Sequence, residues 1–361
     1  MGIFKNMDKC KELLEKLADF YEKEGRYLPW RENTEAYRVW LSEIMLQQTR
    51  VEAVIPYFHR FLSLFPTVFD LASAPEDAVL KAWEGLGYYS RARNLHKAAK
   101  EIAQKHGGTF PKTYEELLSL SGVGEYTAAA IGSVCFGLPT AAVDGNVLRV
   151  YARVFADSRE VTDGSVKKDI RAHLNAHFPS GARAGSVTQG FMEIGQRFCS
   201  PNGMPRCEGC PLADICSAHA EGKETLYPHR AQKKERRKIE KTVLLLHVAS
   251  DYGSAFLIRK RDEGGLLGGL WEFPSADEPL SPEGAMEYAR SLGLMPLAAL
   301  PSVSGVHIFT HLEWHMTGVL IECGNALPDG FVAASAQDLR EKYAIASAFG
   351  IFKDFIFKEL L

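Results

Sequence analysis

A turn built on two glycines, with a helix expected on each side, constrains the fold more than any other feature of the sequence. Residues 119–128 read Ser-Leu-Ser-Gly-Val-Gly-Glu-Tyr-Thr-Ala, and an apolar stretch continues to Cys135. Glycine lets backbone N–H groups approach a ligand closely, and a helix N-terminus favours an anion such as phosphate. The pattern predicts a helix–hairpin–helix unit that grips a phosphodiester without reading bases. An ordinary pair of core helices is the structural alternative.

Two carboxyl groups stand at positions that predict different pKa values. Asp144 precedes the helical run 147–155 and so occupies the place of an N-cap. The helix dipole and its N–H donors are expected to lower the pKa of this carboxyl. Glu43 interrupts the apolar face of a helix expected over 37–46, where burial would raise its pKa. Such a pair fits the acid and the stabilising anion or nucleophile of glycoside hydrolysis. A snorkelling Glu43 and a plain cap at Asp144 are the alternatives.

The motifs around these residues resemble a known family. Gly-Val-Gly-x-x-Thr-Ala at 122–128, followed by Asp-Gly-Asn-Val at 144–147, resembles the endonuclease III superfamily of DNA glycosylases. Lyase members of that superfamily have a lysine two residues after the Gly-Val-Gly. Tyr126 at this position is similar to the adenine-specific branch, the MutY glycosylases. Ser-Glu-Ile-Met-Leu-Gln-Gln-Thr at 42–49 also closely resembles that branch. Ser121 is a departure, because the hairpin of the family usually has proline there.

The resemblance implies a base-excision-repair enzyme. It would remove adenine mispaired with 8-oxoguanine, and also with guanine, by hydrolysing the N-glycosidic bond after base flipping. Glu43 would protonate adenine and Asp144 would stabilise the sugar cation. Tyr126 lies beside this chemistry but cannot form a Schiff base, so little or no AP-lyase activity is expected. Two other interpretations stay open: a bifunctional endonuclease III-like glycosylase and AP lyase, and a non-catalytic iron–sulfur DNA-binding protein.

The same resemblance implies surfaces for the flipped base and for the duplex. The residues expected in the adenine pocket are Trp30, Arg31, Leu46 and Gln189. The residues expected to bind DNA lie in turns and loops: Gln47, Gln48, Thr49, Gly87, Tyr88, Arg91, Gly122, Val123 and Gly124. Tyr88 follows a second Gly-x-Gly turn and is implied to wedge into the base stack, as aromatic side chains can.

Four cysteines are clustered within 18 residues, at Cys199, Cys207, Cys210 and Cys216. This spacing predicts a metal site, but it does not separate structural zinc from an iron–sulfur cluster. By resemblance to the family the loop binds a [4Fe–4S] cluster. The first gap has seven residues here, one more than the six of the family.

The composition changes in the last third of the chain. Strand-like runs at 242–249 and 255–261 precede a glycine-rich loop at 264–274 that resembles the start of Nudix-fold domains. The helix expected near 282–292 lacks the Arg-Glu-x-x-Glu-Glu pattern that binds magnesium, so pyrophosphate hydrolysis is not expected. Downstream, Phe309, Thr310 and His311 resemble the Phe-Ser-His loop that inspects 8-oxoguanine in the family.

We therefore expect a multidomain chain of 361 residues. It would consist of an all-α helix–hairpin–helix glycosylase domain with the cluster loop at 1–222, a basic linker at 223–240, and an α/β Nudix-like 8-oxoguanine recognition domain at 241–361. No apolar run is long enough to cross a bilayer, and no secretory signal is visible. We expect a cytoplasmic, nucleoid-associated bacterial monomer. Its partner would be double-stranded DNA containing 8-oxoguanine:adenine mispairs.

Overall fold

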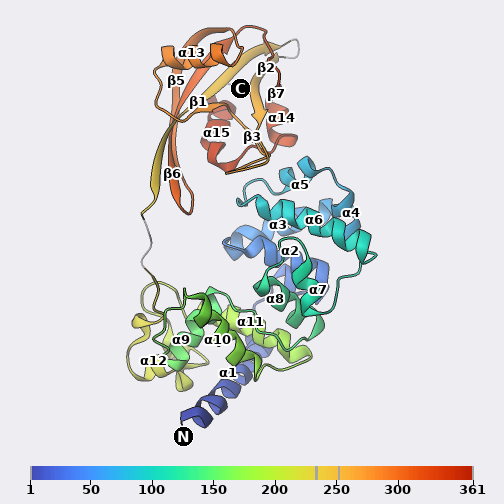
Figure 1. Ribbon diagram of the computed structural model, residues 1–361, viewed down its shortest axis with the longest axis vertical. Helices are drawn as coiled ribbons and strands as arrows, with labels where there is room; N and C mark the ends of the chain where they lie inside the picture. The colour runs from blue at the N-terminus through green and yellow to red at the C-terminus, as the bar shows by residue number, and fades with distance from the viewer. Residues whose placement is uncertain (1, 232–234, 251–252, 360–361) are drawn as a thin grey trace. The chain divides into compact units, whose positions relative to one another are not determined.

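A computed structural model describes residues 2–231, 235–250 and 253–359 (Figure 1). The chain forms two compact units, Met1–Ser73 with Asn94–Gln232, and Ala74–Arg93 with Lys233–Leu361. The first is helical and the second is built on a sheet, which confirms the predicted fold class. The chain passes between the units at three places, after Ser73, after Arg93 and inside the predicted linker. The grouping of 74–93 with the second unit has no signal in the sequence.

The first unit consists of helices joined by short turns. Its α-helices are α1 (Gly2–Glu24), α2 (Ala36–Leu46), α3 (Val51–Leu64), α4 (Val68–Ser73), most of α6 (Ser90–Lys105), α7 (Tyr114–Ser119), α8 (Glu125–Phe136), α9 (Gly145–Phe155), α10 (Gly164–Asn175), α11 (Ala182–Arg197) and α12 (Ser217–Ala220). Short 3₁₀ turns are η1 (Pro29–Arg31), η2 (Cys207–Gly209), η3 (Ala213–Ile215) and η4 (Glu224–Leu226). Among the described residues, no helix combines the length and apolar character that crossing a bilayer requires.

Two groups of helices form the first unit. In one group, α1, α9, α10 and α11 share an apolar core that includes Leu13, Leu17, Val150, Ile170 and Phe191. In the other, α2 packs against α3 and α8, and α7 packs against α8. Helix α11 also contacts α8, so the groups are joined. This arrangement brings the C-terminal end of α2 and the N-terminal ends of α8 and α9 toward the same side of α11.

The two glycines of the opening motif form the predicted turn between α7 and α8. The Val123 N–H donates to the Leu120 carbonyl at 3.1 Å, and both side chains are buried. Gly122 has φ of +72°, which a residue with a Cβ rarely adopts. Gly124 is the N-cap of α8. The helix–hairpin–helix unit is therefore present as predicted.

The second unit contains a mixed sheet. Its strands are β1 (Arg237–Ser250), β2 (Gly253–Lys260), β3 (Trp271–Glu272), β4 (Ser275–Ala276), β5 (Pro296–Ile308), β6 (Leu312–Cys323) and β7 (Phe331–Ser335). Its helices are α5 (Glu76–Ala82), α13 (Pro282–Ser291), α14 (Ala336–Glu341) and α15 (Gly350–Glu359), with the turn η5 (Ser347–Phe349). The strand order is β3-β2-β1-β6-β5, with β4 on β1 and β7 on β2. Strands β1 and β6 are parallel and the other pairs antiparallel.

Helices cover both faces of this sheet. Leu244, Leu246 and Val319 pack with α13 in one apolar cluster. Gly318 lies next to Val319 along β6 and therefore faces the other way, where it meets Phe352 of α15. Strand β1 begins at residue 237, earlier than the expected 242–249, because its parallel pairing with β6 extends to that point.

Candidate active site

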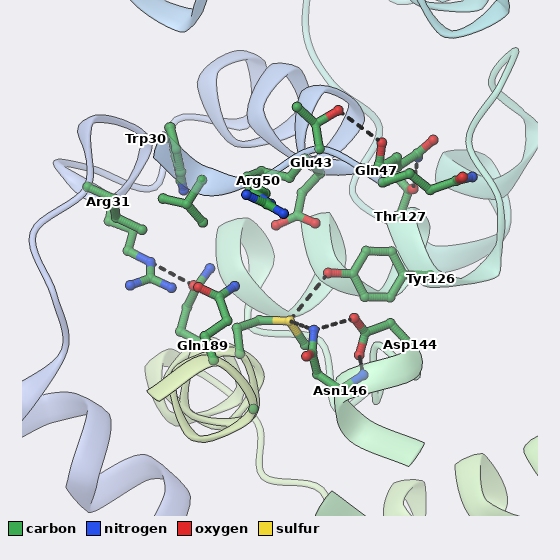
Figure 2. A pocket seen from close by; sticks show the side chains of 18 of the residues that line it. Trp30, Arg31, Glu43, Gln47, Arg50, Tyr126, Thr127, Asp144, Asn146 and Gln189 are labelled. Atoms are coloured by element: carbon green, nitrogen blue, oxygen red, sulfur yellow. Dashed lines mark hydrogen bonds between the residues drawn. The ribbon is translucent and has the colours of Figure 1, made fainter. Parts of the chain in front are cut away.

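A groove of about 1250 Å³ in the first unit brings the predicted site residues together (Figure 2). The end of α2, the starts of α8 and α9, η1 and one face of α11 all contribute to its lining. Its lining includes every predicted catalytic and adenine-pocket residue: Glu43, Tyr126, Asp144, Trp30, Arg31, Leu46 and Gln189. This volume exceeds that of an ordinary pocket for a single small molecule, which is about 300–1,000 Å³.

Glu43 is a buried carboxyl on α2, with 7% of its surface exposed. Burial raises its pKa from 4.5 to about 7, and the negative charge of Asp144 acts in the same direction. The hydroxyl of Tyr126 and the charge of Arg31 oppose this rise but do not cancel it. Figure 2 shows the carboxyl turned into the groove. A protonated Glu43 is therefore available near neutral pH, as predicted.

Asp144 caps α9 through a set of short hydrogen bonds. Its carboxylate accepts from the backbone N–H groups of Asn146 at 2.8 Å and Val147 at 2.9 Å. The side-chain amide of Asn146 also donates to it, at 2.8 Å. The predicted lowering of the pKa is nevertheless wrong, because burial raises the pKa of Asp144 by more than these donors lower it. The three donors still hold the carboxylate in a fixed orientation.

Tyr126 lies between the two carboxyls, in the first turn of α8. Its hydroxyl donates to the sulfur of Met192 at 3.8 Å. Burial raises the pKa of Tyr126 well above its ordinary value, and the charges of Glu43 and Asp144 add to this effect. The side chain is therefore a neutral phenol and offers no amine to a sugar.

The residues of the predicted adenine pocket on the other side of the groove are held by charged side chains around the buried carboxylate of Glu193. Arg31 donates from Nε to Gln189 Oε1 at 2.8 Å and from Nη1 to Glu193 Oε1 at 2.8 Å. Glu193 has no exposed surface, and it also accepts from Arg26. Burial raises the pKa of Glu193, but the two arginines outweigh it, so the pKa is lowered. Trp30 is buried edge-on against Phe58.

Residues at the end of α2 line the same groove. Leu46 is half-buried, and the Gln47 amide donates to Thr127 Oγ1 at 3.3 Å. Gln48 is exposed and has φ of +59°. The Thr49 hydroxyl donates to the Gln47 carbonyl at 3.4 Å.

The three residues of the turn between α7 and α8 differ in their exposure. Gly122 and Gly124 are exposed and line the groove. Val123 is buried and its N–H donates inside the turn, so its side chain anchors the hairpin, and its predicted contact with DNA stays a prediction.

The predicted intercalating loop lies in the second unit. Tyr88 is 46% exposed and has φ of +49°, next to Gly87 with φ of +70°. Arg91, which we expected to bind DNA, is only 8% exposed and donates to the carbonyls of Leu86 and Gly87 at 3.1 Å. It also lies over the rings of Trp83 and Tyr88. Arg91 therefore shapes the loop that presents Tyr88.

The predicted 8-oxoguanine loop connects β5 to β6 in the same unit. Phe309 packs edge-on against Trp314, whereas Thr310 and His311 are exposed. The hydroxyls of Tyr88 and Thr310 lie 3.3 Å apart, within hydrogen-bonding distance. Two loops that are distant in sequence thus meet within the second unit.

The four clustered cysteines line one small apolar cavity of the first unit, together with residues of α9, α11 and α12. Burial raises the pKa of Cys207 to about 11 and that of Cys210 to about 12, and the other thiols of the cluster act in the same direction. Arg153 donates to Cys199 Sγ at 3.1 Å. Four thiols around one cavity, with a cation beside them, fit a metal ion or an iron–sulfur cluster, whose bound thiolates a guanidinium would stabilise.

Several residues that contact the site were not among the predicted site residues. Asn146 orients Asp144, and its own carbonyl oxygen accepts from Arg149 at 2.9 Å. His219 bonds to Glu224 at 2.6 Å, and both lie within 4.8 Å of Cys207. The position of Asn146 two residues after Asp144 could have indicated its role. The pairing of His219 with Glu224 depends on how the loop folds.

Comparison with known proteins agrees with this architecture. Residues 41–176 match the family described as HhH-GPD superfamily base excision DNA repair protein, and residues 245–352 match the NUDIX domain. The fold and the groove thus define a helix–hairpin–helix DNA glycosylase with a Nudix-like domain. The adenine DNA glycosylase of Rattus norvegicus is 34% identical over 355 residues, which cover 82% of this chain and 68% of that protein. That of Buchnera aphidicola subsp. Acyrthosiphon pisum (strain APS) is 34% identical over 307 residues, covering 84% and 85%. The chain belongs to the adenine DNA glycosylase family.

Solved structures resemble the helical part. A thermostable thymine-DNA glycosylase is 26% identical with a TM-score of 0.52, covering 59% of this chain and 98% of that one. Endonuclease III in a trapped covalent intermediate with DNA is 23% identical with a TM-score of 0.51, covering 60% and 98%. The second likeness concerns the fold alone.

Proposed function

We propose that this DNA glycosylase removes adenine mispaired with 8-oxoguanine, and also with guanine, by hydrolysis. The observation that carries the proposal is the arrangement of Glu43, Tyr126 and Asp144. One buried carboxyl has a pKa near 7, a second is held by three donors at a helix N-terminus, and a neutral phenol separates them. Hydrolysis of an N-glycosidic bond needs an acid that protonates the nucleobase and an anion beside the sugar.

In the proposed mechanism Glu43 delivers its proton to N7 of the flipped adenine. The bond between C1′ and the base then breaks, its electron pair stays with the base, and neutral adenine leaves. The Asp144 carboxylate stabilises the oxocarbenium-like sugar and forms a transient covalent bond with C1′. Water then adds to C1′ while the bond from C1′ to Asp144 breaks, and the released proton goes to the Glu43 carboxylate, so that both carboxyls return to their starting states. Tyr126 cannot form a Schiff base, so we propose little or no AP-lyase activity.

Base flipping would expose adenine to the network around Gln189. Because Arg31 occupies Gln189 Oε1, the amide N–H₂ of Gln189 is directed elsewhere and can donate to a base edge. Flipping requires unstacking, which costs on the order of a few kcal/mol. We propose that Tyr88 and the pair Gln47 and Gln48 fill the space that the base leaves.

We propose that the chain is organised as a glycosylase domain at 1–222, a linker at 223–240 and an 8-oxoguanine recognition domain at 241–361. Phe309, Thr310 and His311 would inspect the oxidised base. The exposure of Thr310 and His311 at the end of a hairpin, beside the Tyr88 loop, supports this role.

An excision assay tests the function. Purified protein is incubated with duplexes that carry adenine opposite 8-oxoguanine, guanine or thymine, and each sample is divided and treated with or without alkali. We expect strand scission only after alkali and fastest excision opposite 8-oxoguanine. Strand cleavage without alkali would indicate a lyase. No excision from any duplex would indicate a binding protein and refute the proposal.

Replacing Thr310 with valine is expected to reduce the preference for 8-oxoguanine over guanine. The substitution keeps the shape but removes the hydroxyl, and a lost hydrogen bond to a base costs about 1–3 kcal/mol of discrimination. The measurement is the ratio of single-turnover excision rates on the two duplexes. Thr317→Val, in the same domain on β6, is the matched control. An unchanged ratio in Thr310→Val would remove Thr310 from the inspecting loop.

We propose that Cys199, Cys207, Cys210 and Cys216 bind a [4Fe–4S] cluster, which would supply structural organisation to their loop. The convergence of the four thiols on one cavity and membership of the family support the proposal. Purified protein should be brown and contain about four iron and four sulfide per chain. Cys210→Ser should lose the brown colour and the iron, whereas Cys323→Ser in the other unit should keep both. Stoichiometric zinc without iron after anaerobic purification would contradict the assignment.

A further inference from the structure

A carboxylate on α6 accepts hydrogen bonds from the hairpin turn between α7 and α8. Glu101 accepts two hydrogen bonds from one residue, from the Ser121 backbone N–H at 3.0 Å on Oε2 and from the Ser121 hydroxyl at 2.8 Å on Oε1. Both residues are half-buried and belong to the first unit. Charge-assisted hydrogen bonds of this kind are about twice as strong as neutral ones.

The same face of α6 touches the turn at a second point. A Cβ at Gly122 would lie 2.5 Å from Asn94 Cβ, so the turn rests directly on that residue. Asn94 and Glu101 are seven residues apart and therefore lie on one face of the helix. The turn is thus supported at one position and hydrogen-bonded at the other.

Glu101 is negatively charged at neutral pH. Burial raises the pKa of Glu101, but the two bonds from Ser121 and the charges of Lys105 and Lys97 outweigh it, so the pKa is lowered. The group is therefore a carboxylate beside a turn whose exposed glycines line the groove. A negative charge next to a phosphate-binding turn weakens binding by simple electrostatics. A carboxylate at this position is therefore expected to contribute to phosphate binding in another way that offsets this repulsion.

We propose that Glu101 is a positioning residue for DNA binding, which fixes the backbone of the hairpin through Ser121 so that the glycine turn is preorganised for a phosphate. The inference rests on the proposed function, since it assumes that this turn meets DNA. Serine at position 121 lacks the ring that fixes φ in proline, and the Glu101 carboxylate restrains this residue by accepting from both of its donors. A preorganised turn loses less conformational freedom when the phosphate binds.

Equilibrium binding of the full chain to a duplex with a non-cleavable abasic analogue opposite 8-oxoguanine tests the proposal. Glu101→Asp keeps the charge but is one methylene too short to bridge Ser121, and it should bind roughly tenfold more weakly, the factor for one charge-assisted hydrogen bond. Glu101→Ala should also weaken binding. Glu115→Ala removes an exposed carboxylate from α7 and is the charge control, expected to bind equally or more tightly.

Two further measurements separate positioning from electrostatics and from misfolding. The Ser121 amide should exchange with solvent faster in Glu101→Ala than in the unsubstituted protein, without DNA and at matched global stability. Adding Ser121→Ala to Glu101→Ala should cost no further affinity, because its hydroxyl has already lost its partner. Unchanged exchange, or Glu101 variants that bind like Glu115→Ala, would overturn the inference. Failure of the unsubstituted protein to bind the duplex would instead refute the proposed function.

Discussion

Replacing Glu43 with glutamine is expected to slow single-turnover excision of adenine by about two to four decades, the usual contribution of a positioned proton donor. Glutamine keeps the shape of the buried side chain but delivers no proton to the base. The measurement is the excision rate on an 8-oxoguanine:adenine duplex, together with the affinity for an uncleaved duplex, which should stay near that of the unsubstituted protein.

The matched control is Glu52→Gln, since Glu52 also lines the groove but is exposed at the start of α3. It should excise adenine at nearly the original rate. The pH dependence adds a second check. Because the pKa of Glu43 is about 7, the excision rate should fall as pH rises through that value and the acid loses its proton. An excision rate for Glu43→Gln close to that of the unsubstituted protein would remove Glu43 from the mechanism.

Unfolding measurements show whether Glu43→Gln remains folded. They also test how the free energy of unfolding depends on pH. A carboxyl with a raised pKa binds its proton more tightly in the folded protein, so its contribution to stability falls as pH rises from 4.5 to about 7. At pH 8 this corresponds to a destabilisation on the order of 3 kcal/mol. Glu43→Gln should therefore be more stable than the unsubstituted protein at pH 8, and this gain should disappear below pH 4.5.

Local patterns in the sequence predicted much of the fold and the site. The glycine turn between α7 and α8, the cap at Asp144 and the burial of Glu43 each depend on a few neighbouring residues, so their spacing is visible in the chain. The four cysteines are likewise close in sequence, and the structure places them around one cavity.

Properties that depend on distant contacts could not be predicted in the same way. The pKa of Asp144 is raised because the groove walls bury it, and those walls come from helices far along the chain. Glu193 is paired with Arg26 and Arg31 across more than 160 residues. Arg91 has the side chain of a typical phosphate contact, but in the folded chain its guanidinium donates to the carbonyls of Leu86 and Gly87.

Replacing Asp144 with asparagine is expected to abolish most excision while mismatch binding persists. Asparagine keeps one oxygen that can accept from the N–H groups at the start of α9, so the cap is largely preserved. It lacks the negative charge that opposes the developing sugar cation, and it forms no covalent bond with C1′. Preorganised electrostatic stabilisation is usually the largest single contribution to catalysis, so a loss of at least two to three decades, about 2.7–4 kcal/mol, is expected.

The control for Asp144→Asn must separate lost charge from a weakened cap, and the chain offers a matched one. Asp163 is the N-cap of α10, where it accepts from the Ser165 N–H at 2.8 Å, and it does not line the groove. Asp163→Asn makes the same chemical change at the same position of a helix. If capping alone mattered, both variants would lose stability and neither would lose excision beyond its folded fraction. We expect Asp163→Asn to excise adenine at the original rate and Asp144→Asn to bind but not excise. Rapid excision by a folded Asp144→Asn would refute the anionic role of this residue.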